Sequence, residues 1–383
     1  MKKTITLLLL YLLVASTLNA TIRRVGFIAT INPVNGLDYV NFQAAHDASA
    51  IGDTIYLHPN TNGSQTYSGT VNKTVVVIGP GYFTNTYTLS GTEKANTNLQ
   101  IIAGLINTST FNIDNGSAGS QFIGLNNLTL NTVDQVSPLN NITVRRCRNV
   151  YISFVNSGLC NDWTITSCFG VSMAQSAPAG GFTGNRTISN MTISNSVISS
   201  SINFNTSPTG TFANNRILNC NMVSGASLGL NGATFTVQNC IFDAQSLSGV
   251  NNTTFIKNIT TVALAGNVIS NTLPSTGNQY SIVMSNVYVG YPTNTLVGGV
   301  NTFTNDGRYV LKAASPAING GFLFATATST DCGIFGGTGG TGTAPYILAG
   351  IPPIPTLYRL DAPSAVLPNS GNYTITLSIG SNN

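Results

Sequence analysis

Phe235-Thr236-Val237-Gln238-Asn239-Cys240 is one copy of a six-residue motif that recurs through the middle of the chain. The other copies are Ile142–Cys147, Trp163–Cys168, Met191–Ser196, Asn215–Cys220 and Thr254–Ile259. The last residues, which we call anchors, fall at positions 147, 168, 196, 220, 240 and 259, so successive copies are 21, 28, 24, 20 and 19 residues apart. A unit of this length cannot bury its apolar side alone and must stack on its neighbours. The repeat therefore predicts a solenoid.

Each copy carries an apolar, β-branched residue three positions before the anchor. These residues are Val144, Ile165, Ile193, Ile217, Val237 and Ile256. Their neighbours are mostly polar, and alternation with period two indicates a strand with one buried face. The residue before the anchor is Asn in four copies, and Asn tolerates the left-handed backbone that bends a strand into the next side of a coil. We therefore predict an all-β fold, a right-handed parallel β-helix with rungs about 4.8 Å apart, in which the six residues form one internal file and the anchors form an inward column.

Composition supports a β-rich exported chain. Only 7% of the 383 residues are charged, and the 42% that are hydrophobic occur in short bursts divided by Asn, Gly, Ser and Thr. Low charge and frequent β-branched residues argue against disorder. The length suits one large repeat domain or two ordinary domains.

Residues 1–20 have the pattern of a signal peptide. Lys2 and Lys3 precede the apolar run Ile5–Val14, and Leu18-Asn19-Ala20 is a plausible cleavage site. The run is shorter than the roughly 20 residues of a membrane span. Removing two lysines and no acids lowers the formal charge from +4 to +2, which leaves no basic patch typical of nucleic-acid or membrane-surface binding. We expect a monomer without a transmembrane segment, secreted or held on the outer surface of a Gram-negative bacterium.

Six cysteines in an exported chain raise the question of disulfides. Cys147 with Cys168, and Cys220 with Cys240, would be neighbours on adjacent rungs. The rung spacing exceeds the roughly 3.8 Å between Cβ atoms that a relaxed disulfide prefers. We therefore favour buried free thiols that act as small apolar groups. Cys160 and Cys332 have no assigned partner.

The segment 38–50 predicts a helix that caps the first rung. Asp38 is a suitable N-cap, Gly52 follows the end, and the residues expected to share one face are Val40, Ala44, Ala45 and Ala48. A repeat domain needs such a cap because its exposed end invites association.

Both ends of the repeat region resemble one known family. The runs that carry the resemblance are Phe42–Leu57, Thr66–Gly69 and Lys73–Gly81 at the start, and Leu311–Gly321 and Asp331–Gly337 at the end. They are similar to the capping helix with its Gly-Asp-Thr-Ile strand, the Thr-Tyr-x-Gly turn, the Lys-x-apolar-x-Ile-Gly rung and the closing segment of pectate-lyase-like β-helix proteins of the bacterial secreted type. The resemblance covers about residues 35–340 and implies the fold. It does not imply one activity, because the superfamily holds lyases, hydrolases, esterases, adhesins and proteins without known activity.

The domain prediction has three parts. Residues 1–20 are the signal peptide, residues 21–340 form the β-helix domain, and residues 341–383 form a Pro-rich linker followed by a strand tail. Ile351–Pro355 is a stiff extended linker, and Asn372–Ile379 alternates as a strand does. Ala174–Asn185, rich in Gly and Ala with Pro178, is expected to leave the coil as a loop and accounts for the 28-residue step.

The acidic residues are few for a catalytic β-helix. The chain has eleven, and Glu93 is the only Glu, whereas glycoside hydrolysis usually needs two carboxylates about 5–9.5 Å apart. One predicted outward row is Thr143, Thr164, Thr192, Arg216, Thr236 and Phe255. The second is Arg145, Thr166, Ser194, Leu218, Gln238 and Lys257. Neither row contains an acid, Asp162 and Asp243 flank different copies at different offsets, and the other two faces are left unassigned.

Candidate catalytic residues follow from the resemblance alone. A pectate-lyase mechanism implies clustered acids that hold Ca²⁺ and an Arg or Lys base. Arg145, Arg146 and Arg148 form the one local charge cluster, with Asp162 one coil away; these four are candidates only, because charged residues on a rung are more often simply solvated. We commit to no catalytic residue, cofactor or metal, and Ca²⁺ enters only with the lyase alternative.

Other residue types give weaker signals. His46 and His58 lack further ligands at metal-binding spacing, so we expect cap or surface residues. Tyr280, Tyr288 and Tyr291 suit either stacking on sugars or packing in the coil.

Three functions are compatible with this pattern. The first is an exported, non-catalytic β-helix protein with a cell-surface, adhesive or glycan-binding role. The alternative is a polysaccharide lyase or glycoside hydrolase that acts on an acidic or plant-type polysaccharide. Ice binding by the threonine row is a third, weakened by the interruptions at Arg216 and Phe255.

Overall fold

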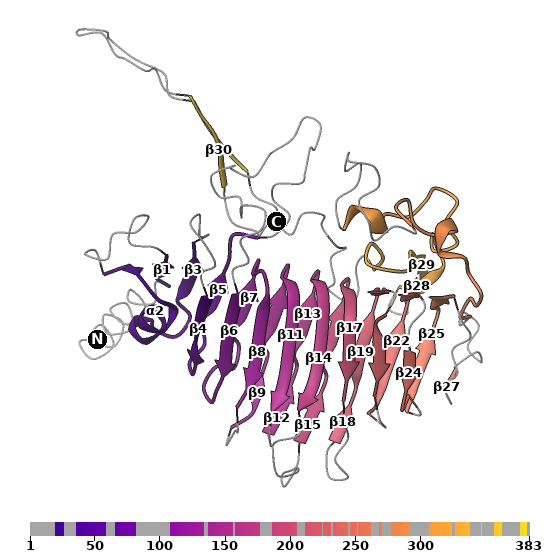
Figure 1. Cartoon of the computed structure of the whole chain (residues 1–383), viewed down its shortest axis with the longest axis horizontal. Helices are drawn as coiled ribbons and strands as arrows, with labels where there is room; N and C mark the ends of the chain where they lie inside the picture. Colours follow the sequence, from indigo (N-terminus) through magenta and orange to yellow (C-terminus); the bar gives the residue numbers. More distant parts are fainter. Residues whose placement is uncertain are drawn as a thin grey trace, which may run out of the picture.

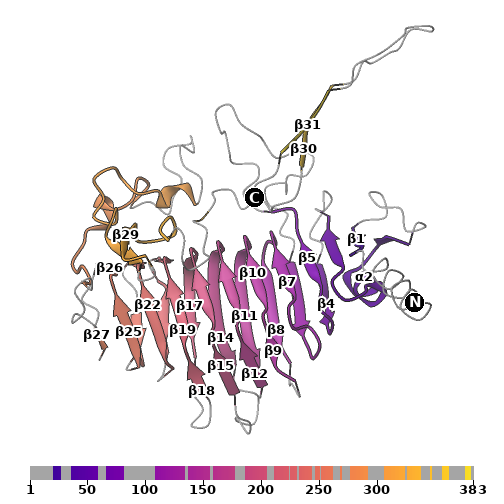
Figure 2. The same cartoon turned by 180° about the vertical axis from the view of Figure 1, so that it is seen from behind.

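The computed structural model describes residues 20–26, 36–58, 66–81, 108–133, 137–155, 158–176, 186–204, 211–223, 225–230, 233–243, 246–250, 252–261, 268–269, 277–291, 306–323, 326–337, 346, 356–361 and 376–380. Within these residues, three parallel sheets run along one long axis, and a short helix lies at the N-terminal end (Figure 1, and Figure 2 from behind). The predicted loop Ala174–Asn185 begins too early, because Ala174–Ser176 belong to a strand. The rest of that loop, the linker Ile351–Pro355 and almost all of the predicted signal peptide lie outside the described residues.

One coil passes through the three sheets in turn. It enters sheet C at β12 (Gly158–Asn161), crosses sheet A at β13 (Thr164–Thr166) and continues into sheet B at β14 (Phe169–Ser176). The next coil repeats this order with β15 (Arg186–Ser189), β16 (Thr192–Ser194) and β17 (Val197–Asn203), and each pair is parallel. The predicted parallel β-helix is therefore confirmed.

The other strands extend these stacks. Sheet A also holds β2 (Asp38–Tyr39), β1 (Ile22–Val25), β3 (Thr54–Leu57), β5 (Val76–Ile78), β7 (Gln121–Ile123), β10 (Thr143–Arg145), β19 (Asn215–Leu218), β22 (Phe235–Gln238), β25 (Thr253–Ile256) and β27 (Val268–Ile269). Sheet B also holds β4 (Thr66–Val71), β6 (Thr108–Ile113), β8 (Leu128–Thr132), β11 (Arg148–Val155), β20 (Asn221–Met222), β21 (Ser227–Gly229), β23 (Ile241–Phe242), β24 (Ser246–Ser248) and β26 (Ile259–Thr260). Sheet C is completed by β9 (Leu139–Asn140) and β18 (Thr211–Ala213).

The internal file is confirmed for five of its six residues. Val144, Ile165, Ile193, Ile217 and Val237 face one another in successive strands of sheet A, and each is fully buried. The prediction for Ile256 is wrong, because Val237 faces Phe255 and Ile256 faces Gln238. The last copy is shifted by one residue because Lys257 adopts the left-handed turn, with φ 54°, that Asn239 adopts in the rung before, with φ 55°.

The anchor column needs the same correction. Its members are Cys147, Cys168, Ser196, Cys220, Cys240 and Asn258. Asn258 takes the last place instead of Ile259, because Cys240 N donates to Asn258 Oδ1 at 2.9 Å while Ile259 faces Ile241 in sheet B. All six cysteines of the chain are free and buried, as predicted.

The capping helix is present but shorter than predicted. Helix α2 (Phe42–Ala48) starts after Asn41, whose side chain accepts from Ala44 N, so the prediction of Asp38 as N-cap is wrong. Asp38 instead belongs to β2, and its buried carboxylate forms an ion pair with the half-exposed Arg24. The buried face consists of Phe42, Ala45 and His46, whereas Val40 is 45% exposed. Aromatic packing decides this face, since the Phe42 ring lies 4.4 Å from that of Phe111 in sheet B.

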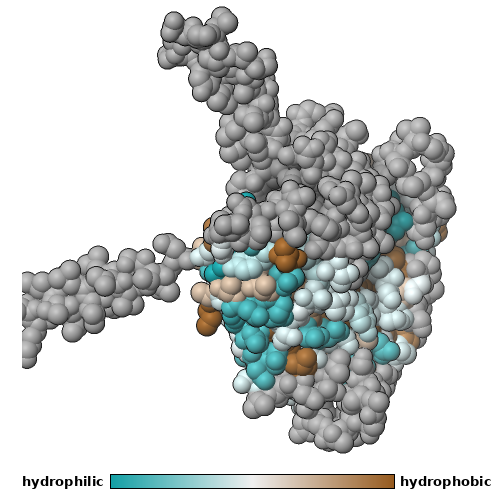
Figure 3. Space-filling view, turned by 60° about the vertical axis from the view of Figure 1, so that its left-hand side comes forward, coloured by the Kyte–Doolittle hydropathy of each residue, from teal (hydrophilic) through white to brown (hydrophobic). Residues whose placement is uncertain are grey.

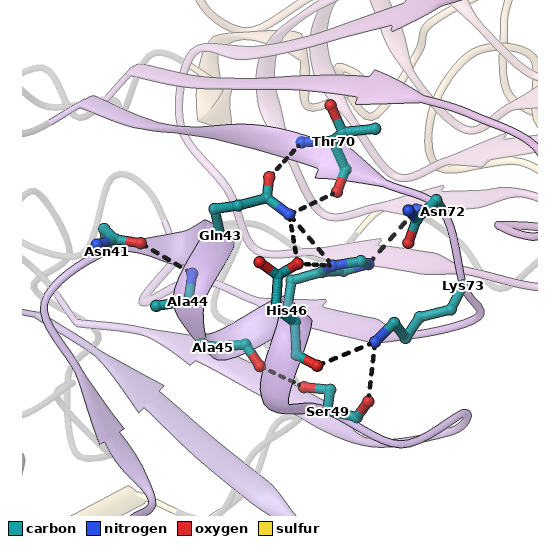
Figure 4. A network of polar contacts seen from close by, with 10 residues as sticks. Asn41, Gln43, Ala44, Ala45, His46, Ser49, Thr70, Asn72 and Lys73 are labelled. Atoms are coloured by element: carbon teal, nitrogen blue, oxygen red, sulfur yellow. Dashed lines mark hydrogen bonds and ion pairs between the residues drawn. The ribbon is translucent and has the colours of Figure 1, made fainter.

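The residues near α2 tie the cap to the first rungs (Figure 4). Gln43 Oε1 accepts from Thr70 N at 2.8 Å, and His46 Nε2 accepts from Asn72 N at 3.4 Å. Lys73 Nζ donates to two carbonyl oxygens of the helix end. In the view of Figure 3, the exposed apolar residues of this end lie as separate patches among polar ones.

A C-terminal cap, which we define as the described residues between 277 and 346, packs on the outside of the coil (Figure 1, orange). It contains the 3₁₀ turns η3 (Met284–Asn286) and η5 (Gly307–Tyr309) and the hairpin β28 (Gly321–Leu323) and β29 (Thr328–Thr330). Outward residues of sheet B meet it in a second hydrophobic core. The members of this core are Val197, Ile241, Ile259, Met284, Val287, Tyr288, Tyr309, Ala317, Cys332, Ile334 and Tyr346.

The tail contains one more strand than predicted. Strand β31 (Thr376–Gly380) lies near the predicted strand Asn372–Ile379, and it pairs antiparallel with β30 (Thr356–Asp361), which was not predicted.

Candidate ligand-binding face

The outer face of sheet A carries the predicted threonine row with one correction. Thr143, Thr164 and Thr192 are in register, Arg216 interrupts them, and Thr236 is followed by Thr254 instead of Phe255. The last member of the second row is correspondingly Ile256 instead of Lys257. The C-terminal cap covers part of this second row, because Gln238 Nε2 donates to Phe322 O at 2.7 Å and Ser194 is fully buried. This face is therefore only partly open to a ligand.

The four lyase candidates fall into two groups. Arg145 ends β10, Arg146 forms the corner that follows, with φ 51°, and Arg148 begins β11, so the arginines lie together at the corner between sheets A and B. Asp162 lies at the opposite corner, before β13 and level with Asn141. Asp162 and Arg145 are thus four residues apart along the strand direction, or roughly 13 Å. The structure brings the arginines together and leaves the carboxylate on the far edge of the sheet.

The two histidines lie near the N-terminal end of the coil in different environments, one in the helix and one after a strand. His46 is fully buried in α2, and burial lowers its pKa although the Asp47 carboxylate, which accepts a hydrogen bond from the ring, raises it. His58 follows β3, packs edge-on against Tyr56 and also has a pKa lowered by burial. Over the described part of the chain, no three His, Cys, Asp or Glu side chains come together as a metal site would require.

The outer face of sheet B presents a row of side chains that the sequence had left unassigned. Its residues pair in register from strand to strand, and Tyr151 stands in the middle. The row, which we call the Tyr151 row, reads Ser68, Thr110, Thr129, Tyr151 and Ser172. The neighbouring row, two residues further along the same strands, contains Asn131, Ser153 and Ala174. Hydroxyl, amide and small side chains therefore surround one tyrosine.

Tyr151 is held outward by its own strand. Its neighbours Val150 and Ile152 are both fully buried in the coil, so the alternation of the strand leaves the Tyr151 ring 38% exposed. Asn149, at the start of the same strand, donates from Nδ2 to Asn127 Oδ1 at 2.7 Å, which fixes an amide pair beside the row. A tyrosine combines an apolar ring face with a polar hydroxyl, and such rings among hydrogen-bonding side chains are typical of polar-ligand sites.

The outer face of sheet B continues from Ser172 to the C-terminal cap across a β-bulge. Ser199 follows Ile198, which pairs with Val171, and the backbone of Val223 bonds to Ile198 O. Asp243 N in turn bonds to Met222 O, so Ser199, Val223 and Asp243 are in register with one another. They continue the outer face of sheet B beyond a β-bulge, because Val171 pairs with Ile198 but Met173 pairs with Ile202. Among the Tyr151 row and these three residues, Asp243 is the charged one.

Asp243 accepts a hydrogen bond from a tyrosine of the cap. Tyr291 Oη donates to Asp243 Oδ1 at 3.4 Å, and Arg308 lies over the Tyr309 ring with its guanidinium carbon 4.6 Å from the centroid. Burial raises the pKa of Asp243, and the hydrogen bond from Tyr291 partly opposes that rise. Tyr291 and Arg308 are partly exposed. An acceptor carboxyl and a partly exposed phenol therefore lie together at this end of the face, while the Arg308 guanidinium stacks on the Tyr309 ring.

The three tyrosines singled out from the sequence have different places. Tyr288 is 3% exposed and packs in the second core, and Tyr280 packs partly buried against the coil. Tyr291 is partly exposed beside Asp243, so it alone of the three can reach a ligand on this face.

Tyr151 was missed because the sequence motif stops at the anchor. The signal lay just beyond it, where Val150, Ile152 and Phe154 alternate with Tyr151 and Ser153. That alternation identifies a strand with Tyr151 outward, although only the stacking shows which residues stand beside it.

Comparisons with known proteins give one structural match to report. No family model matches the chain, and the search of curated proteins also finds no match. Among solved structures, the crystal structure of pectate lyase Pel9A is similar, with 13% sequence identity, a TM-score of 0.41, and coverage of 82% of this chain and 96% of that chain. The chain's own three stacked parallel sheets establish that its fold is a parallel β-helix.

Proposed function

We propose that the chain is an exported, non-catalytic β-helix protein that binds a glycan at a cell surface through the outer face of sheet B. The observation that carries the proposal is the exposed Tyr151 ring in the middle of a row of serines and threonines. Stacking on the ring and hydrogen bonds from the hydroxyl groups are the two contacts that sugars make with proteins.

The distribution of acids supports a binding role over a catalytic one. Hydrolysis of a glycosidic bond usually needs two carboxylates about 5–9.5 Å apart. Asp243 is the one carboxylate among the described residues of the Tyr151 row and of its continuation beyond the β-bulge, and Asp162 lies at the corner between sheets C and A. The alternative, a polysaccharide lyase or hydrolase, is favoured by one observation, the cluster of Arg145, Arg146 and Arg148 beside this face.

The predicted signal peptide supports export, and placement on the outer surface of a Gram-negative bacterium belongs to the same proposal. In the part of the chain that the structure describes, no helix has the length and apolar character needed to cross a membrane.

The test is binding of purified protein to a panel of polysaccharides, measured by pull-down with insoluble glycans and by affinity electrophoresis with soluble ones. We expect Tyr151→Ala to weaken binding about tenfold, since an aromatic contact is worth roughly 1–1.5 kcal/mol. The matched control is Leu159→Ala, which removes a large apolar side chain of similar exposure from a different sheet. Leu159 on sheet C is 41% exposed and Tyr151 is 38% exposed. Equal binding by the wild-type protein and both variants would contradict the proposal.

A second assay separates binding from catalysis. Uronic-acid polymers are incubated with the protein, with and without Ca²⁺, and absorbance reports newly formed double bonds. We expect no signal. A signal that Arg145→Ala abolishes would replace the binding role with the lyase alternative.

A further inference from the structure

We infer that Asp243 and Tyr291 form a second contact point for the same ligand, so that the ligand is a linear, neutral glycan chain lying along the axis of the β-helix. This inference rests on the proposed function, because it takes Tyr151 as the first contact point.

The distance between the two points sets the length of the ligand. Tyr151, Ser172, Ser199, Val223 and Asp243 stand in five successive rungs of sheet B. Four rung steps of about 4.8 Å place Asp243 on the order of 19 Å from Tyr151, which is longer than a disaccharide. A ligand that touches both must be an extended chain, and the row fixes its direction along the stacking axis.

The path between the two points runs along the edge of the C-terminal cap, because Val223 packs against the second hydrophobic core. Ser172 and Val223 are partly exposed, Ser199 is exposed, and each has a small or medium side chain. Ser172 Oγ donates to Val150 O at 3.1 Å, so this hydroxyl lies close to the sheet instead of projecting over the row. A chain can therefore lie along the row without displacing a large side chain.

The chemistry of the Asp243 end selects a neutral ligand. Asp243 accepts one hydrogen bond from Tyr291, and an ionised carboxylate has room for several. Sugar hydroxyls can fill the remaining positions as donors, and charge-assisted hydrogen bonds of this kind are strong. A uronate or sulfate group would instead face a like charge at that position. Tyr291 adds a partly exposed ring at the same point.

Isothermal titration with linear neutral oligosaccharides of increasing length tests the inference. Cello-, xylo- and manno-oligosaccharides are used, from disaccharides to chains longer than the 19 Å span estimated from the rung spacing. We expect affinity to rise until the chain reaches both points. Asp243→Asn should weaken the binding of long chains roughly tenfold, because a hydrogen bond to a charged group is lost. The affinity for disaccharides should stay the same.

Asp162→Asn is the matched control. Asp162 is an exposed aspartate on the far corner with φ 59°, and other rungs have Asn141 and Asn190 in the same left-handed position, so the substitution fits the backbone. We expect it to change neither length dependence nor affinity. Thermal unfolding of Asp243→Asn checks that the variant is folded.

The outcomes separate the inference from the proposed function. Binding that needs Tyr151 but shows no length dependence, or is unaffected by Asp243→Asn, overturns the inference and leaves the proposed function standing. A preference for anionic over neutral chains overturns the neutral class. Absence of any Tyr151-dependent binding overturns both.

Discussion

At the scale of single residues, the anchor column shows why this position takes Cys, Ser and Asn. The side chains of Cys147, Ser196, Cys240 and Asn258 each accept from a main-chain N–H of the rung before and donate to a carbonyl oxygen, so they join two rungs. Ser196 Oγ accepts from Cys168 N at 3.0 Å and donates to Ser194 O at 2.7 Å. Asn258 repeats this with Cys240 N and Val237 O. The corner therefore selects small side chains that can both accept and donate, and a buried file of apolar residues at this position would leave amides unpaired.

Ser196 provides the test of that role. Ser196→Ala removes the hydroxyl group alone and leaves the buried Cys168 N–H without its partner, so we expect a loss of about 1–3 kcal/mol in the free energy of unfolding. Ser196→Cys should cost much less, because cysteine occupies the same position in the adjoining rungs. Urea denaturation measures both. Equal destabilisation by the two substitutions would show that packing, and not hydrogen bonding, decides the position.

Asp243 gives a pH-dependent prediction at the same scale. Burial raises its pKa in the folded state above the unfolded value near 3.8, so the folded state binds the proton more tightly. Stability contributed by this group is therefore present below pH 3.8 and is lost as the pH rises through the folded pKa. Asp243→Asn should flatten this part of the profile and raise the melting temperature at neutral pH relative to wild type. Calorimetry from below pH 3.8 to neutral pH measures the melting temperature of both proteins. The same pH dependence in wild type and Asp243→Asn would show that Asp243 does not contribute to it.

At the scale of elements, the N-terminal cap depends on a neutral histidine. His46 Nε2 accepts from Asn72 N, and a protonated ring would turn a donor towards that amide (Figure 4). Burial lowers the pKa of His46 below its usual 6.5, and the charges facing the ring are Lys73, which also lowers it, and Asp47, which raises it. The stabilisation is present above pH 6.5 and is lost as the pH falls through the folded pKa. We expect the protection of β4 amides, measured relative to their intrinsic exchange rates, to fall at acid pH in wild type, and to depend less on pH in His46→Gln.

The elements also show which parts of the fold can be predicted from the sequence. The file from Val144 to Val237 follows from period two, which needs only local information. The last copy of the motif was aligned one residue too late. Asn258 precedes Ile259 as Asn239 precedes Cys240, but the left-handed turn in this rung is at Lys257. The choice between these two residues depends on which one can fill the anchor column. The Tyr151 row and the Asp243 end of the same face depend on stacking and on the C-terminal cap, so neither can be derived from the motif alone.

At the scale of the whole molecule, the C-terminal cap closes the outside of the coil. Val197, Ile241 and Ile259 point outward, away from the main core, and would be exposed apolar residues if the cap did not cover them. Gly333 lies at the closest approach, with φ +83°, and its N–H bonds to Asn239 O. A Cβ at this position would lie 2.4 Å from Asn221 Oδ1 and 2.7 Å from Ile241 Cδ1.

Gly333→Ala should therefore loosen the cap as a unit. The backbone strain of a positive φ costs roughly 1 kcal/mol, and the contacts with Asn221 and Ile241 add to it. Gly225→Ala is the matched control, because Gly225 has φ +87° and nothing lies within 4 Å of an added Cβ. We expect Gly333→Ala, but not Gly225→Ala, to bind more of an apolar dye and to aggregate at a lower temperature than wild type, as measured by light scattering. The reason is that Gly333→Ala uncovers Val197, Ile241 and Ile259. Equal behaviour of the two variants would mean that the cap yields at Gly333 without exposing the second core.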